Sequence, residues 1–261
     1  MTARGDLERA GKAAHVPGRE TLAKPLPKRF YKEAMVAADK AGGFTVLLDG
    51  RAAKTPGKRK LIAPTEALAS AMAGEWAAQG ERIDPARMEL TRLVNTAIDG
   101  VAGKEAEVAD DIVAFAGSDL VCYRAEAPEG LIAEQAKAWD PLVAWVRERF
   151  DARLKLAAGI VHVAQDAKAI ERVRAHVHTY DALRLAALHV MTTLTGSAVV
   201  ALAVAEGRID AAAAWKAAHV DEDWQIRFWG EDAEARARRE QRWRTMQAAS
   251  RLLELIHAPD G

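Results

Sequence analysis

The segment from Val220 to Glu234 combines two kinds of side chain that proteins use to bind other proteins. It carries three large aromatic residues, Trp224, Phe228 and Trp229. Acidic residues flank them on both sides, at Asp221, Glu222, Asp223, Glu231, Asp232 and Glu234. Aromatic side chains supply buried area in an interface, and a charged rim supplies orientation and register. Packing into the protein core is the more common use of such aromatics, so two interpretations of the segment stay open.

The single cysteine, Cys122, is the strongest candidate for a catalytic nucleophile. It lies in the apolar run Leu120–Tyr123, where a thiol usually packs as an inert side chain. An enzyme that uses Cys122 or a carboxylate in a cleft between two domains is therefore the alternative to a binding protein. One cysteine can form neither an intrachain disulfide nor a cysteine metal cluster, which fits a reducing compartment.

No motif indicates a nucleotide, a metal or another cofactor. Gly5–Lys12 imitates a phosphate loop, but it has one residue too many between its glycines, and Ala13 stands where Ser or Thr should follow. His176 and His178 point to different faces of a helix, although His189 on the next helix could approach one of them. Hydrogen-bonded helical histidines are the more usual arrangement. We expect no cofactor and no metal.

Five arginines lie between Arg236 and Arg244, with Trp243 among them. An RNA-binding helix could look like this. The arginines alternate with Glu234 and Glu240, however, and an apolar stripe runs along the same segment, which is typical of a solvated helix face. Lys plus Arg and Asp plus Glu both number 37, so the basic surplus of a non-specific nucleic-acid binder is missing. We expect no nucleic-acid partner.

The elements that must position these residues divide the chain into a β-containing part and a helical part. Antiparallel strands are expected over residues 30–38, 44–48 and 51–55, followed by a short apolar piece at 61–63. Asp49-Gly50 is a strong two-residue hairpin signal, because both residues tolerate positive φ. Helices are then expected over residues 64–79, 88–98 and 105–115.

After about Arg124 the pattern predicts helices and no further strand. They are expected over residues 131–150, 166–179, 181–194, 197–206, 210–229 and from 232 to just before Pro259. Pro141 should kink the first of these or start a new helix. The predicted fold class is α+β, with a small antiparallel β-containing N-terminal domain followed by an all-helical C-terminal domain. We place a mobile arm at residues 1–27 and the two domains at 28–125 and 126–261.

The apolar segment from Leu185 to Ala205 contains too many polar residues for a membrane span, and a pair of buried core helices explains it better. The N-terminus is rich in Arg and Ala but carries Asp6, Glu8 and Glu20, whereas transit peptides are poor in acidic residues. We therefore expect no membrane contact and a cytoplasmic location.

A series of different short motifs is spread along most of the chain from Lys28 onward. They are Lys28-Arg29-Phe30-Tyr31-Lys32, Leu48-Asp49-Gly50-Arg51 with Lys54-Thr55-Pro56, Glu75-Trp76-x-x-Gln79, Thr96-Ala97-Ile98-Asp99, Ser118-Asp119-Leu120 with Cys122-Tyr123-Arg124, Gln135-x-x-x-Trp139-Asp140-Pro141-Leu142, Thr195-Gly196-Ser197, and Asp221-Glu222-x-x-Gln225-x-x-x-Trp229-Gly230-Glu231-Asp232. In this order and spacing the chain resembles the assembly chaperones of the F-type ATP synthase catalytic head that bind its alpha subunit.

The resemblance implies a protein that is not an enzyme and needs no cofactor. Such a chaperone binds the unassembled alpha subunit and prevents its aggregation until the beta subunit displaces it. The family's emphasis on acidic residues of the C-terminal domain carries over to Glu222 and Glu231, with Asp221, Asp223 and Trp229 as further partner-binding candidates. The family occurs in bacteria and in the mitochondrial matrix. We expect a monomeric, cytoplasmic bacterial member.

Overall fold

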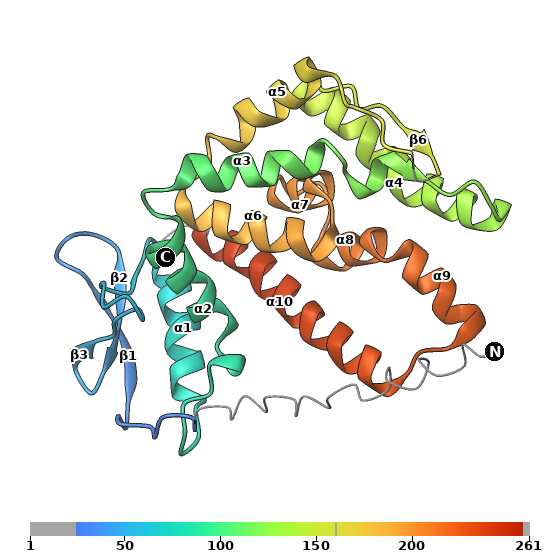
Figure 1. Cartoon of the computed structure of the whole chain (residues 1–261). Coiled ribbons are helices and arrows are strands. Elements are labelled where there is room, and N and C mark those ends of the chain that lie inside the picture. The colour runs from blue at the N-terminus through green and yellow to red at the C-terminus, as the bar shows by residue number, and fades with distance from the viewer. Residues whose placement is uncertain (1–24, 160, 258–261) are drawn as a thin grey trace, which may run out of the picture.

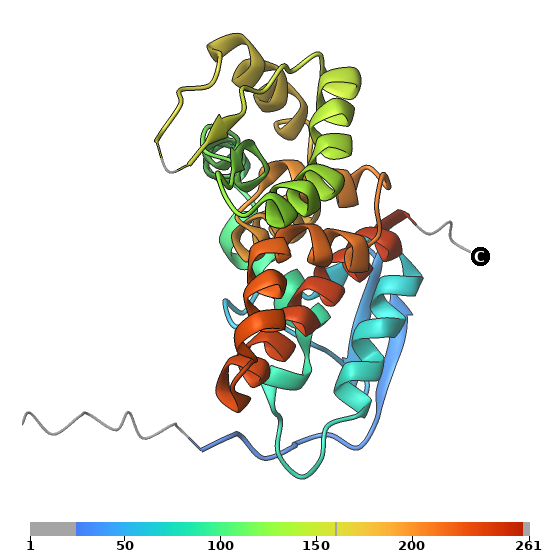
Figure 2. The ribbon, with the colours of Figure 1, turned by 90° about the vertical axis from the view of Figure 1, so that its right-hand side faces the viewer.

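The structure, a computed structural model, describes residues 25–159 and 161–257. A small sheet lies at one end with α1 (Glu66–Ala77) and α2 (Glu89–Thr96), and α4 (Glu129–Phe150) lies with α5 (Ala167–Val177) at the other (Figures 1 and 2). The predicted α+β class is confirmed. Most of the arm predicted at residues 1–27, including the Gly5–Lys12 stretch, lies outside the described residues, as do residues 258–261.

The sheet is built around β2 (Phe44–Leu48), which pairs antiparallel with β1 (Ala34–Ala38) on one edge. Its other edge pairs with β3 (Arg51–Ala52) and β4 (Ile62–Ala63). Asp49 and Gly50 have φ of 47° and 77°, the positive values that a two-residue hairpin turn of this kind requires. The predicted hairpin is confirmed.

The strand predicted over residues 30–38 begins only at Ala34, because the residues before it bind elsewhere. The backbone N–H groups of Lys32 and Glu33 both donate to the carboxylate of Asp49, at 2.9 Å each. These bonds fasten the incoming chain to the β2–β3 turn instead of to a neighbouring strand.

The returning strand, predicted over residues 51–55, is also shorter. The carbonyl of Ala53 accepts a hydrogen bond from the N–H of Leu61, and Lys54 pairs with Lys60 as an isolated bridge. The chain therefore leaves the sheet after β3 and returns to it as β4.

Helix α1 (Glu66–Ala77) packs across the sheet and begins where predicted, because the Thr65 side chain accepts a hydrogen bond from the Leu68 N–H. It is followed by α2 (Glu89–Thr96), which runs into a π-helical turn at Ala97–Val101, and by α3 (Glu105–Ala116).

The second half contains α4 (Glu129–Phe150), α5 (Ala167–Val177), α6 (Ala182–Thr195), α7 (Ala198–Ala205), α8 (Ala211–Ala218), α9 (Val220–Trp229) and α10 (Ala233–His257). Two expectations were wrong here. The helix predicted over residues 210–229 is divided, because His219 leaves helical geometry at φ −114° and ψ 22° and its ring nitrogen Nδ1 bonds to the carbonyl of Trp215. A strand also follows Arg124, since β5 (Tyr123–Arg124) pairs in parallel with β6 (Ala157–Ala158). Two residues are too few to show a strand's alternation in the sequence. Helix α4 runs through Pro141 without a break.

Helices α6 and α7 form the centre of the core. Every residue of α7 from Ala198 to Val204 is buried, and α6 packs against α2, α3, α7 and α10. The segment from Leu185 to Ala205 is thus a pair of buried helices, and none of the helices described is long and apolar enough to span a membrane. Helices α2 and α3 of the predicted N-terminal domain pack on α6 of the predicted C-terminal domain. The boundary between the two domains at residue 125 therefore stays a prediction.

Candidate partner-binding surface

Helices α9 and α10 are joined at the side of the molecule opposite the sheet, and α10 runs from there back towards α1 and α2 (Figure 1). Gly230 ends α9 with φ 77° and ψ 179°, a conformation that favours glycine. The carboxylate of Asp232 then accepts a hydrogen bond from the N–H of Ala235 at 2.8 Å and starts α10. This turn places the end of α9 outside the core.

Trp224 anchors α9 to α4. Its ring lies so close to the backbone of Gly130 that a Cβ atom there would be 2.6 Å from the indole. The guanidinium of Arg227 stacks over the same ring at 4.9 Å and forms an ion pair with Glu134 of α4. Core packing therefore explains the first of the three aromatic residues.

The other two aromatic side chains point into solvent. Phe228 is 64% exposed and Trp229 is 83% exposed, although Phe228 still contacts Trp224 with ring centroids 5.1 Å apart. Large aromatic side chains rarely stay this exposed without a use in binding. We call Phe228 and Trp229 the aromatic tip of α9.

Two of the acidic candidates are bound within the chain. Asp221 accepts a hydrogen bond at 2.7 Å from the side-chain amide of Gln135, a buried residue of α4. Asp223 forms an ion pair with Arg239 of α10. These contacts hold α9 against its two neighbours and leave less of either carboxylate for a partner.

Glu222 and Glu231 differ in how far solvent reaches them. The Glu222 side chain is 43% exposed and its carboxylate is 3.7 Å from Nε2 of His219. Burial lowers the pKa of His219, so the ring is mostly neutral near pH 7 and leaves the charge of Glu222 uncompensated. The Glu231 side chain is only 16% exposed and lies 3.2 Å from Nε of Arg236. Of the acidic candidates, Glu222 is therefore the one best placed to meet a partner.

The arginine run on α10 is neutralised by its own surroundings. Arg236, Arg238, Arg239 and Arg244 each form an ion pair with an acidic residue, respectively Glu231, Glu234, Asp223 and Glu240. Arg242 donates to the carbonyl of Leu194 at 2.7 Å. Trp243 packs against Trp215, with ring centroids 5.4 Å apart. A helix on which most arginines are paired with acidic side chains differs from an RNA-binding helix, which presents a continuous basic face.

Comparisons with known proteins agree with this arrangement of elements. Residues 28–147 match the family model of the ATP12 chaperone protein. Atp12 from Paracoccus denitrificans is 42% identical, with a TM-score of 0.83 over 88% of this chain and 99% of that one. The Atu1473 protein from Agrobacterium tumefaciens is 48% identical, with a TM-score of 0.84 over 88% of this chain and 86% of that one. The mitochondrial protein atp12 of Schizosaccharomyces pombe is 26% identical over 226 residues, which are 81% of this chain and 77% of the relative.

The chain belongs to the ATP12 chaperone family. The resemblance seen in its motifs is confirmed, and the chain is accordingly an ATP synthase assembly chaperone.

Cys122 of this ATP12-family chain is poorly suited to nucleophilic catalysis. The residue is buried, and burial, with the nearby Asp119 carboxylate, raises the pKa of its thiol to about 12. A thiol with so high a pKa forms almost no thiolate near neutral pH.

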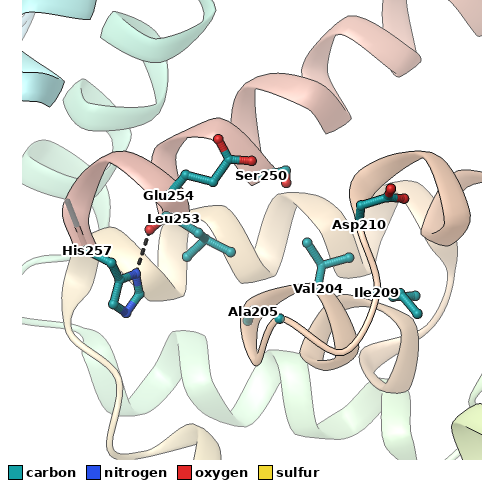
Figure 3. A pocket seen from close by; sticks show the side chains of 9 residues that line it. Val204, Ala205, Ile209, Asp210, Ser250, Leu253, Glu254 and His257 are labelled. Carbon is teal, nitrogen blue, oxygen red and sulfur yellow. Dashed lines mark hydrogen bonds between the residues drawn. The ribbon is translucent and has the colours of Figure 1, made fainter.

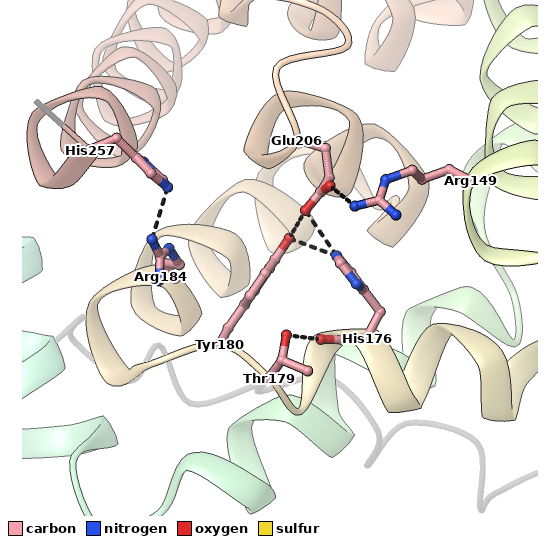
Figure 4. A network of polar contacts seen from close by, with 7 residues as sticks. All are labelled: Arg149, His176, Thr179, Tyr180, Arg184, Glu206 and His257. Atoms are coloured by element: carbon pink, nitrogen blue, oxygen red, sulfur yellow. Dashed lines mark hydrogen bonds and ion pairs between the residues drawn. The ribbon is translucent and has the colours of Figure 1, made fainter.

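His176 and His178, at the end of α5, form hydrogen bonds to neighbouring elements. Nε2 of His176 lies 2.9 Å from a carboxylate oxygen of Glu206, which also accepts from the hydroxyl of Tyr180 at 2.6 Å (Figure 4). Arg149 binds the other oxygen of Glu206 at 2.8 Å. His178 bonds to Asp110. Within residues 25–159 and 161–257 no group of three potential metal ligands comes together.

The hollow between α7 and α10 has mostly apolar walls (Figure 3). It measures about 330 Å³. Three of its polar side chains are bound within the chain: Asp210 caps α8 through the Ala213 N–H at 2.7 Å, Nδ1 of His257 bonds to the Leu253 carbonyl at 2.6 Å, and Glu254 forms an ion pair with Arg251 at 2.8 Å. The hollow therefore lacks the convergent, free polar groups of a typical active site.

Sequence reasoning did not select Phe228 for the site. Its spacing of four from Trp224 places both residues on one face of the helix. That face extends past the part of α4 that covers it, so Trp224 is covered and Phe228 is not. Gly130 and Gln135 were also not recognised as the anchors of α9, because both lie some 90 residues away in the sequence.

Proposed function

We propose that this chain is the chaperone that holds the unassembled alpha subunit of the F-type ATP synthase until the beta subunit displaces it. The observation that carries the proposal is the aromatic tip, which stands exposed at the end of α9, with the exposed Glu222 in the first turn of the same helix. Membership of the ATP12 chaperone family supports an ATP synthase subunit as the partner.

The aromatic tip fits a partner that must be held and later released. Burying one large apolar side chain contributes about 1.5–3 kcal/mol, so Phe228 and Trp229 together supply roughly 3–6 kcal/mol before the costs of association. Such an anchor strengthens a complex without making it irreversible. The acidic side chains beside it orient the partner and favour a basic or polar rim on the opposite surface.

The proposal includes a holding mechanism without ATP, a cofactor or catalysis. It also includes a monomeric chaperone in the bacterial cytoplasm, which one subunit of the partner engages at a time. A monomer suits this role because a self-associated chaperone would cover the hydrophobic tip that the client requires. Light scattering after size-exclusion chromatography measures the mass of the free chain and of its complex.

The test is the aggregation of isolated alpha subunit, followed by light scattering as the subunit is diluted from denaturant. The chain should suppress the scattering in proportion to its concentration and without ATP. Addition of beta subunit should then release the chain. Unchanged scattering, together with no alpha subunit recovered on the immobilised chain, would refute the proposal.

A further inference from the structure

The chain has no net charge, but its charges are unevenly distributed. Residues 25–63, which include the sheet, contain nine basic and three acidic residues and so carry a net charge of +6. The Val220–Glu234 segment contains six acidic residues and one arginine, a net charge of −5. Figure 1 shows the two segments on opposite sides of the molecule. The sheet is therefore the basic pole of a neutral protein.

A hollow of about 600 Å³ opens at this basic pole. The segment before β1 contributes Phe30 and Tyr31 to its walls, β3 and the two residues after it contribute Arg51 to Lys54, and α1 contributes Trp76. Phe30 is 72% exposed, and its ring meets that of Tyr31 edge to face at 5.3 Å. The hollow is thus lined by aromatic side chains and by the exposed basic residues Arg51 and Lys54.

The β3 side of the hollow is an open strand edge. Leu48 and Arg51 flank the two-residue turn and bond to each other, and the N–H of Ala53 donates to Val46 at 2.8 Å. The alternation of an antiparallel pair then turns the N–H and C=O of Ala52 away from β2. Outside the strand pairings, no hydrogen bond that the Ala52 N–H donates or its C=O accepts is found within the described residues. Unpaired edge groups of this kind can accept another extended chain.

We propose that this hollow binds an extended, acidic polypeptide segment of a partner protein. The backbone of the segment pairs with Ala52 at the β3 edge, its carboxylates meet Arg51 and Lys54, and an apolar side chain packs on Phe30. This surface is separate from the aromatic tip at the other pole, so the inference goes beyond the proposed function and does not depend on the identity of its client.

Three features favour a polypeptide over other anionic partners. An open strand edge satisfies a peptide backbone, which neither a lipid headgroup nor a nucleic acid can match. An apolar side chain next to the carboxylates of such a peptide can pack against the aromatic residues of the hollow. Asp49 also lies at the hollow, and its carboxylate would repel a closely spaced row of phosphates more than separated carboxylates.

The experiment measures fluorescence anisotropy of a short labelled peptide in which Glu and Val alternate, titrated with the full chain. The peptide should bind, and its affinity should fall with added salt. A peptide in which Lys and Val alternate should not bind. Reversing both charges in Arg51→Glu/Lys54→Glu should lower affinity by about tenfold or more, since two attractive contacts become repulsive.

Matched variants separate the site from the general charge of the sheet. Lys40→Glu makes the same kind of change in the β1–β2 turn, at the other end of β2, and should alter affinity by less than about twofold. Ala52→Pro removes the outward N–H at an edge position where proline is tolerated, and should weaken binding while the melting temperature stays near the wild-type value. If Ala52→Pro unfolds the chain, the charge-reversed variant still decides the question.

Three results would overturn the inference. The Glu–Val peptide could fail to bind, or it could bind the charge-reversed variant as well as the wild-type chain. An oligothymidylate or a vesicle containing phosphatidylglycerol could displace the peptide at lower concentration than unlabelled peptide does, which would assign the surface to another class of partner. Because alpha subunit is absent from this assay, its outcome is independent of the aggregation test.

Discussion

The hydroxyl of Ser197 donates a hydrogen bond to the carboxylate of Asp119, which is fully buried. The same carboxylate accepts from the N–H groups of Val121 at 3.2 Å and Val199 at 3.0 Å. It therefore joins the turn after α3 to the first turn of α7, two parts of the chain separated by 78 residues.

We expect Asp119→Ala to lower the free energy of unfolding by about 3 kcal/mol, because it leaves several buried donors without an acceptor. Ser197→Ala should cost about 1–2 kcal/mol, and the double variant less than the sum of the two, since both changes remove one shared contact. Urea unfolding followed by circular dichroism measures all three. Equal stability of Asp119→Ala and the wild-type chain would show that the cluster does not hold α7.

The cost of Asp119→Ala should also depend on pH. Burial raises the pKa of Asp119 to about 6, above its value in the unfolded chain. The folded state then binds more protons between pH 4 and 6, so this group's contribution to stability falls as pH rises through that window. The difference between the wild-type chain and Asp119→Ala should narrow from about pH 4 to pH 6. Other carboxylates titrate in both proteins and cancel in the comparison.

Gly130→Ala tests how α9 is anchored. A methyl group at this position would lie 2.6 Å from the ring of Trp224, so the ring must move, and we expect a loss of about 1–3 kcal/mol. The control is Gly74→Ala within α1, where a Cβ atom meets nothing within 4 Å. Alanine is the better helix former, so this control should gain about 0.5–1 kcal/mol. A gain from both substitutions would mean that Trp224 does not pack tightly on α4.

The local features that proved predictable from the sequence depend on near neighbours. The hairpin at Asp49-Gly50, the cap at Thr65 and the buried pair α6 and α7 each follow from a few consecutive residues. The features that escaped prediction depend on distant ones. Asp49 shortens β1 by binding Lys32 and Glu33, and α4 decides which of the α9 aromatics is covered. The sequence therefore identified the Val220–Glu234 segment as a candidate surface. The structure was needed to show which of its side chains are exposed and which are bound within the chain.

Cys122 offers a direct test of the enzyme alternative. Because its thiol is buried with a pKa raised to about 12, a thiol reagent should label the native chain far more slowly than the chain in denaturant. Cys122→Ala should suppress alpha-subunit aggregation as well as the wild-type chain does. Rapid labelling of the native chain, together with a loss of aggregation suppression in Cys122→Ala, would favour a catalytic role for the thiol.

Glu222→Lys and Glu231→Lys should have different effects. The exposed Glu222 contributes to the partner surface, so its reversal should weaken alpha-subunit binding by about tenfold with little change in stability. Glu231 is largely covered and pairs with Arg236, so its reversal places a lysine beside that arginine and should also cost about 1 kcal/mol of stability. The control is Glu234→Lys, whose side chain is 82% exposed. Unchanged binding by both variants would remove the acidic residues from the partner surface.

The aromatic tip should contribute more to partner binding than any acidic residue. Trp229→Ala and Phe228→Ala remove exposed side chains and should leave the melting temperature near that of the wild-type chain, whereas each should cost about 2 kcal/mol or more of binding energy to alpha subunit. The matched control is Val161→Ser, which removes an apolar side chain that is 70% exposed elsewhere on the surface and should leave binding unchanged. Titration calorimetry with isolated alpha subunit measures the affinities. If all three variants bind equally well, the exposed aromatics of α9 serve another purpose and the partner docks on a different face.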